Sequence, residues 1–312
     1  MRAVAPARQQ SRERLLVHAS LALVAVLFSI HFVVGKIALR SFDPLTFAWL
    51  RVAGSAICLL LLTGSRKRET VPLSRADGWR LVLYATLGVA INQLLFISGL
   101  ALTTAHEAAI LITTIPVFTL ISAVVLGTEK LTPSKTAGIL LALTGAILLI
   151  GRGHAIVVRP ESLLGDALIL LNCAAYGLYL VLSRPIMKQI GAVRAVTRIF
   201  AIGAVIMIPF CVKSMIHERW NEIPRDAWIA LIVVILGPTV AAYLLNAWSL
   251  ARAESTLVAA YTYVQPFVAS LLATVFLGEI ISASIAGAAV LIFVGVYLSG
   301  RASKVEPALP AP

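Results

Sequence analysis

The sequence has little charge: Asp, Glu, Lys and Arg make up 13% of its 312 residues, whereas hydrophobic residues make up 60%. Soluble globular proteins carry about a quarter charged residues, so this composition excludes an ordinary soluble domain. Cysteine is also scarce. Cys58, Cys173 and Cys211 lie in apolar segments at spacings that suit neither a zinc site nor a disulfide framework, so we interpret them as packing residues.

Motifs of soluble catalysis are absent as well. The sequence contains no GxxxxGK[ST] phosphate loop, no HExxH metalloprotease motif and no GxSxG nucleophile turn. No Asp or Glu lies in the middle of a long apolar run, and no acidic or His cluster suggests a metal site. We therefore expect no ATP hydrolysis, no metal, no other cofactor and no enzymatic activity.

Long apolar runs dominate the chain. A helix needs about 20 apolar residues to cross roughly 30 Å of hydrocarbon, and lipid leaves unpaired backbone groups without partners, so each crossing should be a helix. We predict an all-α integral membrane protein with ten transmembrane helices. Their approximate ranges are Leu15–Val34, Pro44–Thr63, Trp79–Leu102, Ala105–Leu126, Thr132–Ile150, Leu163–Ser183, Val193–Ile216, Trp228–Leu250, Thr256–Leu277 and Ile281–Ser299.

The net charge of +12 comes mainly from Lys and Arg in the loops between these runs. The basic residues concentrate in the segments that are cytoplasmic if the N-terminus is inside, as the positive-inside rule requires. This distribution indicates a lipid bilayer, and not nucleic acid, as the partner, with both termini cytoplasmic. Residues 1–14 are expected to be a basic tail and residues 301–312 a disordered one. We expect a multi-pass protein of the cell inner (plasma) membrane whose first apolar run is retained as a helix.

The chain also contains an internal repeat. Leu94–Leu148 and Leu244–Leu298 align without a gap at one constant offset. Five predicted crossings per copy is an odd number, so the second copy must enter the membrane from the opposite side. We therefore predict two inverted five-helix repeats (5+5), at residues 15–150 and 163–300. Such repeats are typical of secondary transporters, whose substrate site lies near the midplane between the repeats.

Ordered motifs recur in the two copies. The first copy reads Ile115-Pro116-Val117-Phe118, then Glu129, Gly138 and Gly145; the second reads Gln265-Pro266-Phe267, then Phe276-Leu277-Gly278-Glu279, Gly287 and Gly295. Earlier in the copies an aromatic residue stands eight positions before a basic one, as Phe28 before Lys36 and Tyr176 before Arg184, and Arg51 follows Pro44.

In these motifs the chain resembles the drug/metabolite transporter superfamily, in the EamA-type branch with two tandem EamA units. The resemblance covers nearly the whole chain. Phe28 and Tyr176 stand where the family often has Trp, and Thr128 stands where it usually has Gly. The resemblance implies a secondary exporter of small metabolites, and it does not fix the substrate.

Several motif residues are expected to act on the architecture. Pro116 and Pro266 lack an N–H and interrupt a helix, which leaves open a hinge beside a solvated cavity or a packed kink. Glu129 and Glu279 lie at helix ends, where we expect them to cap the following helix. Small residues recur every four positions at Gly138, Ala142 and Ala146, and similarly at Gly287, Leu291 and Gly295, which favours close helix packing either within one molecule or in a homodimer. Gly145 and Gly295 are expected to be structural.

Substrate contacts should come from polar and aromatic side chains inside the spans, because polar groups in lipid normally face the bundle interior. Arg51 lies inside a span, where it can bind an anionic solute or form a buried structural pair. His31 and Glu107 are expected on the same side of the membrane, and His31 is either a proton relay or a packing residue. The candidate substrate-binding residues are His31, Arg51, Asn92, Gln93, Thr113, Asn172, Tyr176, Tyr179, Tyr243, Asn246, Trp248, Tyr261 and Gln265.

A cavity lined by amides, hydroxyls and aromatic rings suits amino acids or other amphipathic and aromatic metabolites. The sequence thus predicts a secondary transporter that works by alternating access, as an exporter, with a small molecule as its substrate. The alternative is a membrane-embedded enzyme or receptor that uses the bundle as a scaffold. An enzyme of that kind needs a cluster of catalytic groups and a receptor needs an output domain, and the sequence suggests neither.

Overall fold

The computed structural model describes residues 7–64, 73–102, 111–151, 160–266, 268 and 283–302. These residues form helices and short connections, with no strand among them, as an all-α fold requires. Six helices in this part of the chain are long and apolar enough to cross a membrane. The count of ten crossings, the inversion of the repeats and the cytoplasmic placement of both termini stay predictions.

Helices follow the expected spans over most of their described residues. In the first half they are α1 (Ala7–Ala38), α2 (Pro44–Gly64), α3 (Arg75–Ala85), the π-helical η1 (Thr86–Ile91), α4 (Asn92–Leu102), α6 (Ile115–Val125) and α7 (Pro133–Gly151). In the second half they are α8 (Pro160–Ile190), α9 (Ala192–His217), η2 (Trp220–Glu222), α10 (Arg225–Val234), the π-helical η3 (Ile235–Ala241), α11 (Ala242–Leu250), α12 (Ser255–Ala260), η4 (Tyr261–Tyr263) and α14 (Ala283–Ala302).

The starts of two helices are fixed by local chemistry. Pro44 is the first residue of α2, where a missing N–H costs nothing, and Asp43 Oδ1 accepts a hydrogen bond from the Leu45 N–H at 2.9 Å. Ser74 and Asp77 form a reciprocal capping box at the start of α3. Short polar residues before the apolar runs therefore determine where these helices begin.

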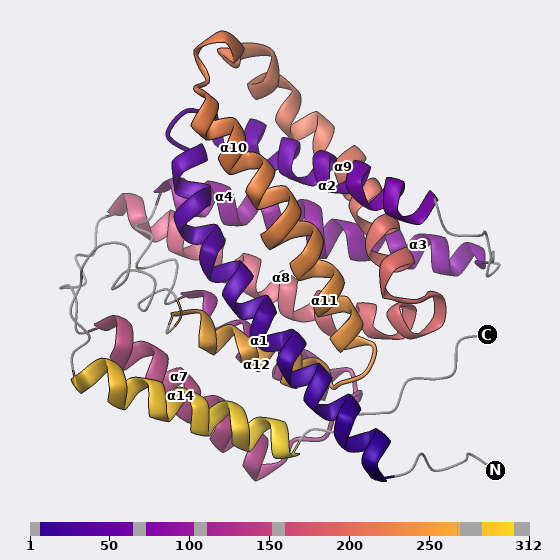
Figure 1. The fold of residues 1–312 in the computed structure, drawn as a ribbon, viewed down its shortest axis with the longest axis vertical. Coiled ribbons are helices and arrows are strands. Elements are labelled where there is room, and N and C mark those ends of the chain that lie inside the picture. The colour runs from indigo at the N-terminus through magenta and orange to yellow at the C-terminus, as the bar shows by residue number, and fades with distance from the viewer. Residues whose placement is uncertain are drawn as a thin grey trace.

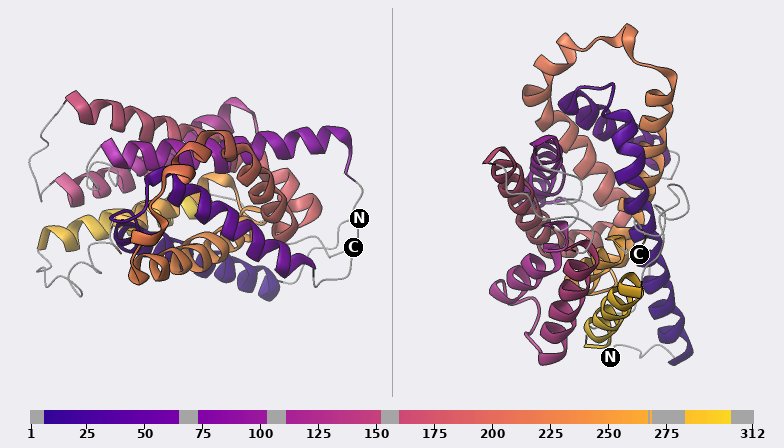
Figure 2. Two further views of the ribbon diagram at one scale, coloured as in Figure 1. Left: turned by 90° about the horizontal axis from the view of Figure 1, so that it is seen from above. Right: turned by 90° about the vertical axis from the view of Figure 1, so that its left-hand side faces the viewer.

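Helices from the two halves of the chain pack against one another. The most extensive contacts join α7 to α14, α2 to α9 and α4 to α8, while α1 crosses α10 and α11. In Figure 1, α1 and the α10–α11 rod run diagonally across the front, and α7 lies beside α14 at the lower left. Figure 2 shows the α7–α14 pair at one edge of the bundle from a further side. The interior is thus built between the two halves and not within each one.

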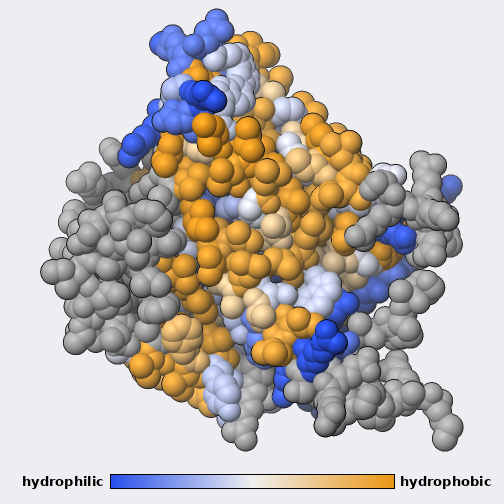
Figure 3. All heavy atoms as spheres, in the orientation of Figure 1, coloured by the Kyte–Doolittle hydropathy of each residue, from blue (hydrophilic) through white to orange (hydrophobic). Residues whose placement is uncertain are grey.

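The surface of the bundle is largely apolar. Exposed aliphatic side chains include Ile57 on α2, Val205 and Ile216 on α9, and Ile232 on α10. Figure 3 shows apolar residues over most of the visible face, with hydrophilic residues gathered at the top, over the α9–α10 connection, and at the lower right. An apolar belt between two polar ends is the surface that a lipid bilayer covers.

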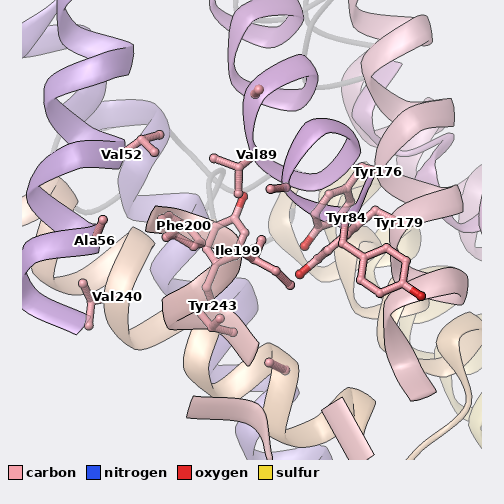
Figure 4. Packing of buried hydrophobic residues seen from close by; sticks show 14 of the residues in the cluster. Val52, Ala56, Tyr84, Val89, Tyr176, Tyr179, Ile199, Phe200, Val240 and Tyr243 are labelled. Atoms are coloured by element: carbon pink, nitrogen blue, oxygen red, sulfur yellow. The ribbon is translucent and has the colours of Figure 1, made fainter. Parts of the chain in front are cut away.

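Aromatic and aliphatic residues from several helices fill the core. Phe200 of α9 and Tyr243 of α11 make an edge-to-face contact with ring centroids 4.9 Å apart, and Figure 4 shows them side by side near Val89. Phe28 of α1 contacts the same tyrosine ring in a second edge-to-face pair, at 5.9 Å. Such geometries let aromatic rings pack densely across helix boundaries.

The small-residue faces of α7 and α14 meet each other within the molecule. A Cβ added at Gly295 would lie 2.5 Å from the Gly138 carbonyl oxygen, and one added at Gly138 would lie 2.7 Å from the Gly295 oxygen. The backbones approach this closely because neither residue has a side chain. Of the two arrangements left open by the sequence, the structure shows the intramolecular contact at Gly138 and Gly295, and a homodimer stays a prediction. Gly145, on the same helix as Gly138, is buried as well.

A matched pair of glycines tests this packing. Gly295→Ala should destabilise the protein by about 1–3 kcal/mol, because its Cβ meets backbone that cannot move aside. Gly287→Ala, on the same helix, meets nothing within 4 Å and should be neutral or stabilise by up to about 1 kcal/mol through helix propensity. Thermal unfolding of both variants in detergent measures the difference, and equal midpoints would contradict the proposed contact.

Candidate functional site

Two π-helical segments stand at corresponding positions of the repeats. η1 is followed directly by Asn92 and Gln93, and η3 contains Thr239 and precedes Tyr243. η1 contains Gly88, and a Cβ added there would lie 2.4 Å from the Tyr179 ring. The aligned residue in η3 is Pro238, which lacks an N–H and so cannot donate a helical hydrogen bond. π-Helical turns are rare and occur frequently at functional sites. Here each one places polar side chains in the bundle interior.

The prolines of the repeated motif mark breaks in two further helices. Pro116 is the second residue of α6 and follows a turn at Thr113 and Thr114, while Pro266 comes shortly after the 3-10 segment η4. α1 contacts the second break: Ser29 Oγ donates to the Gln265 carbonyl oxygen at 3.1 Å. The break therefore has partners for backbone groups that a continuous helix would pair internally. Whether either break acts as a hinge stays a prediction.

A cavity of about 100 Å³ lies at the centre of these irregular segments. Its walls come from both repeats, namely from α1, α2, α4, α6 and the residues before it, α8, α11, α12 and η4. The lining residues are Val24, Ala25, Phe28, His31, Arg51, Asn92, Gln93, Phe96, Ile112, Ile115, Asn172, Tyr176, Leu180, Tyr243, Asn246, Val258, Ala259, Tyr261, Thr262 and Gln265.

Arg51 is the hub of the polar wall, with 3% of its surface exposed. Its Nε donates to Thr239 Oγ1 of η3 at 2.7 Å. Its Nη1 lies 3.1 Å from His31 Nε2 on α1 and donates to Gln93 Oε1 on α4 at 3.0 Å. A guanidinium has only donors, so His31 Nε2 must accept, and the imidazole is neutral in this arrangement. One side chain thus joins helices of both repeats.

Amide and tyrosine side chains extend this network around the cavity. Gln93 Nε2 donates to Asn92 Oδ1 at 2.9 Å and lies 3.4 Å from the Tyr243 hydroxyl. Asn172 Nδ2 of α8 donates to the Asn92 backbone oxygen at 2.7 Å. Asn246 Nδ2 of α11 donates to the Tyr176 hydroxyl at 3.3 Å. These contacts join polar side chains from α4, α8 and α11 at the cavity wall.

Most of the predicted substrate-binding residues come together at this cavity. Those that line it are His31, Arg51, Asn92, Gln93, Asn172, Tyr176, Tyr243, Asn246, Tyr261 and Gln265. Three do not. Thr113 and Tyr179 are buried in the protein beside it, and Trp248 packs beneath the Arg252 guanidinium, 4.1 Å from the ring centroid. Glu107 and Glu279 lie outside the described residues. Substrate binding by any of these residues stays a prediction.

Some residues of the site were not among those predicted from the sequence. Phe28 and Phe96 contribute rings to the wall, and Thr239 bonds to Arg51. Thr239 follows Pro238 in the interior of an apolar span, and a polar residue next to a helix-breaking residue was a usable signal. Phe96 carried no signal, because one apolar ring in an apolar helix resembles any other, whereas Phe28 stands in the repeated motif, eight positions before Lys36.

Glu129 belongs to a second buried group, which we call the Lys135 cluster (Glu129, Lys135, Glu254). Lys135 Nζ lies 2.9 Å from Glu129 Oε2 and 2.5 Å from Glu254 Oε2, with 2% of its side chain exposed. Glu129 Oε1 also accepts from the Thr256 N–H at 3.2 Å. The expectation that Glu129 caps the following helix is therefore wrong: it caps α12, in the other repeat, because the chain brings that helix start against the α6–α7 connection.

The Lys135 cluster joins the two repeats at one end of the bundle. Glu129 and Lys135 come from the first repeat, and Glu254 and Thr256 from the second. In the aligned second copy, Ile285 stands where the first copy has Lys135. The sequence therefore provides this lysine at one end only, and the two ends of the bundle are chemically different.

The fold and the cavity define a class: a multi-pass membrane protein with a polar cavity built between two halves of a helical bundle. Residues 16–151 and 163–301 each match the EamA-like transporter family, and the chain belongs to this family. The protein is accordingly a membrane transporter.

Several known proteins are similar to it along their whole length. An uncharacterized transporter of Archaeoglobus fulgidus is 28% identical over 90% of this chain and 96% of its own. The uncharacterized inner membrane transporter YedA of Escherichia coli K12 is 28% identical over 92% and 94%. A solved crystal structure, described only as that of a protein, superposes with a TM-score of 0.74 at 19% identity over 89% of this chain and 94% of its own. The last similarity concerns the fold alone.

Removing the central cation tests the Lys135 cluster. Lys135→Met should lower the stability by about 3–5 kcal/mol, because it leaves two carboxylates close together without a buried partner. Lys130→Met, an exposed lysine on the same connection, is the matched control and should change the stability little. Chemical or thermal unfolding in detergent compares them. Equal stability of the two variants would show that the cluster contributes nothing, and adding Glu129→Gln and Glu254→Gln to Lys135→Met should recover part of the loss.

Proposed function

We propose that this transporter is a secondary exporter that moves small metabolites by alternating access, with the central cavity as its substrate site. Amino acids and other amphipathic or aromatic metabolites are the proposed substrates. The observation that carries the proposal is a cavity lined by amides, hydroxyls, an imidazole and a guanidinium in the interior of an apolar bundle. Polar groups there are costly, and in membrane proteins they mark substrate pathways.

The position of the cavity supports alternating access. Its walls come from both matched segments, so a movement of one repeat against the other changes the cavity itself. The breaks at Thr113–Thr114 and at η4 lie in helices that border the cavity, and we propose that they are the hinges. Transporter action then requires that the two repeats close alternately at the two ends of the bundle.

The direction and the membrane are proposals of the same kind. YedA of Escherichia coli is described as an inner membrane transporter, and we propose the bacterial-type inner membrane for this chain. Export as the direction follows from the resemblance to the EamA-type branch. We propose that His31, in contact with Arg51, mediates any coupling to protons.

Flux in proteoliposomes tests the function. Purified protein should be reconstituted into vesicles loaded with labelled amino acids and aromatic metabolites, and efflux measured with and without a pH gradient. Wild type should move at least one solute faster than protein-free vesicles, and Arg51→Ala should reduce that flux at least about tenfold, because it removes the charge and three hydrogen bonds of the cavity wall. Arg252→Ala, outside the cavity, serves as the control.

The pH gradient separates the possible mechanisms. Stimulated flux that is lost in His31→Ala indicates proton coupling through the imidazole, whereas flux indifferent to the gradient indicates facilitated diffusion. Wild-type flux no faster than in empty vesicles, for every solute in the panel, would count against the proposal.

A further inference from the structure

We propose that the cavity selects solutes with one net negative charge, carried by a carboxylate on an apolar or aromatic body, and that Arg51 binds the carboxylate. This inference rests on the proposed transport function and names its substrate class. It favours plain monocarboxylates over zwitterionic amino acids, which carry the same carboxylate.

The hydrogen bonds of Arg51 leave room for an anion. A guanidinium has five N–H groups. Thr239, His31 and Gln93 accept from Nε and Nη1, and among the described residues none accepts from Nη2. The two N–H groups of Nη2 are therefore available on a side chain that lines the cavity. Carboxylate oxygens are the acceptors that guanidinium donors bind most strongly.

The charges of the cavity point to the same solute. The three partners of Arg51 are a hydroxyl, a neutral imidazole and an amide, so none of them cancels its charge. Among the described residues that line the cavity, none is a carboxylate. A buried charge without a counter-ion is costly, and leaving it so is worse than pairing it. Among the described lining residues, the charge of Arg51 is therefore unbalanced, and a bound monoanion neutralises it.

This balance distinguishes solutes that differ only in charge. A monoanion brings the site to net zero. A zwitterion leaves the net charge at +1 and adds an ammonium group with no carboxylate partner among the described lining residues. A cation raises the charge to +2, and a neutral amide leaves the charge of Arg51 unpaired. The expected order of affinity is monoanion, zwitterion, neutral amide and cation.

The rest of the lining selects an apolar body. Phe28, Phe96, Ile112, Ile115 and Leu180 supply hydrocarbon, and the rings of Tyr176 and Tyr243 add aromatic surface. The edge-to-face contact between Phe28 and Tyr243 holds these two rings in place. An aromatic or branched aliphatic body can contact such walls while its carboxylate lies against Arg51.

Four compounds on one scaffold test the inference: 3-phenylpropionate, phenylalanine, 3-phenylpropanamide and phenylalaninamide. Binding to purified protein is measured by thermal stabilisation and calorimetry. We expect 3-phenylpropionate to bind at least about tenfold more tightly than each of the other three. Arg51→Gln should abolish this preference, and Arg51→Lys, which keeps the charge, should retain it with weaker binding. Arg252→Gln applies the same change to an arginine outside the cavity and should leave the order unchanged.

The outcomes separate this inference from the proposed transport. Tighter binding of phenylalanine, equal binding of the neutral amide, or no binding of 3-phenylpropionate to wild type each overturns the monoanion class. These comparisons use wild type alone, so they decide even if Arg51→Gln fails to fold. If the flux of a zwitterion or a cation is unchanged in Arg51→Lys and Arg51→Gln, the inference is overturned and the transport function stands. If none of the four compounds and no solute of the wider panel is transported, the result counts against the transport function itself.

Discussion

A charged guanidinium in the interior of an apolar bundle is the constraint on which the rest of the site depends. Lipid tails and apolar side chains have no hydrogen-bond acceptors, so the acceptors for Arg51 must come from polar groups of the protein. They lie on three other elements: His31 on α1, Gln93 on α4 and Thr239 on η3. Two of these belong to the first repeat and one to the second. The network therefore connects the two repeats in this structure and leaves part of the guanidinium facing a cavity.

Irregular backbone supplies the geometry that this network needs. A continuous α-helix would pair its own backbone groups and present its side chains at a fixed rotation. The π-helical segments η1 and η3, and the breaks before Pro116 and Pro266, interrupt that regularity close to the cavity. Irregular backbone is tolerated at membrane depth only where it is buried in protein or faces a polar cavity, and here the protein provides both. These departures from helical geometry therefore place the polar residues that line the cavity.

The two repeats match the same family but differ in their buried charged and polar residues. Glu129 lies in a buried ion cluster with Lys135 and Glu254, whereas the aligned second copy has Ile285 in place of the lysine. The described cavity lining is also uneven, since its one arginine comes from the first repeat and its three tyrosines come from the second. Both repeats contribute to the central cavity, while these unmatched residues make its lining and the two ends of the bundle chemically different.

The sequence by itself determined that the protein lies in a membrane, that it is helical and that it belongs to its family. Hydropathy, the length of apolar runs and ordered motifs can all be recognised in the sequence without any tertiary contact. It also located most of the polar residues that line the cavity, because polar side chains inside apolar spans normally face the bundle interior. Only the tertiary structure decided the partners. Glu129 caps α12 and not the next helix, Tyr179 packs against Gly88 outside the cavity lining, Trp248 lies beneath Arg252, and Thr239 completes the shell of Arg51. Except for the Trp248–Arg252 pair, which is only four residues apart, these contacts join residues far apart in the chain. Sequence spacing carries no information about which faces of two distant helices meet.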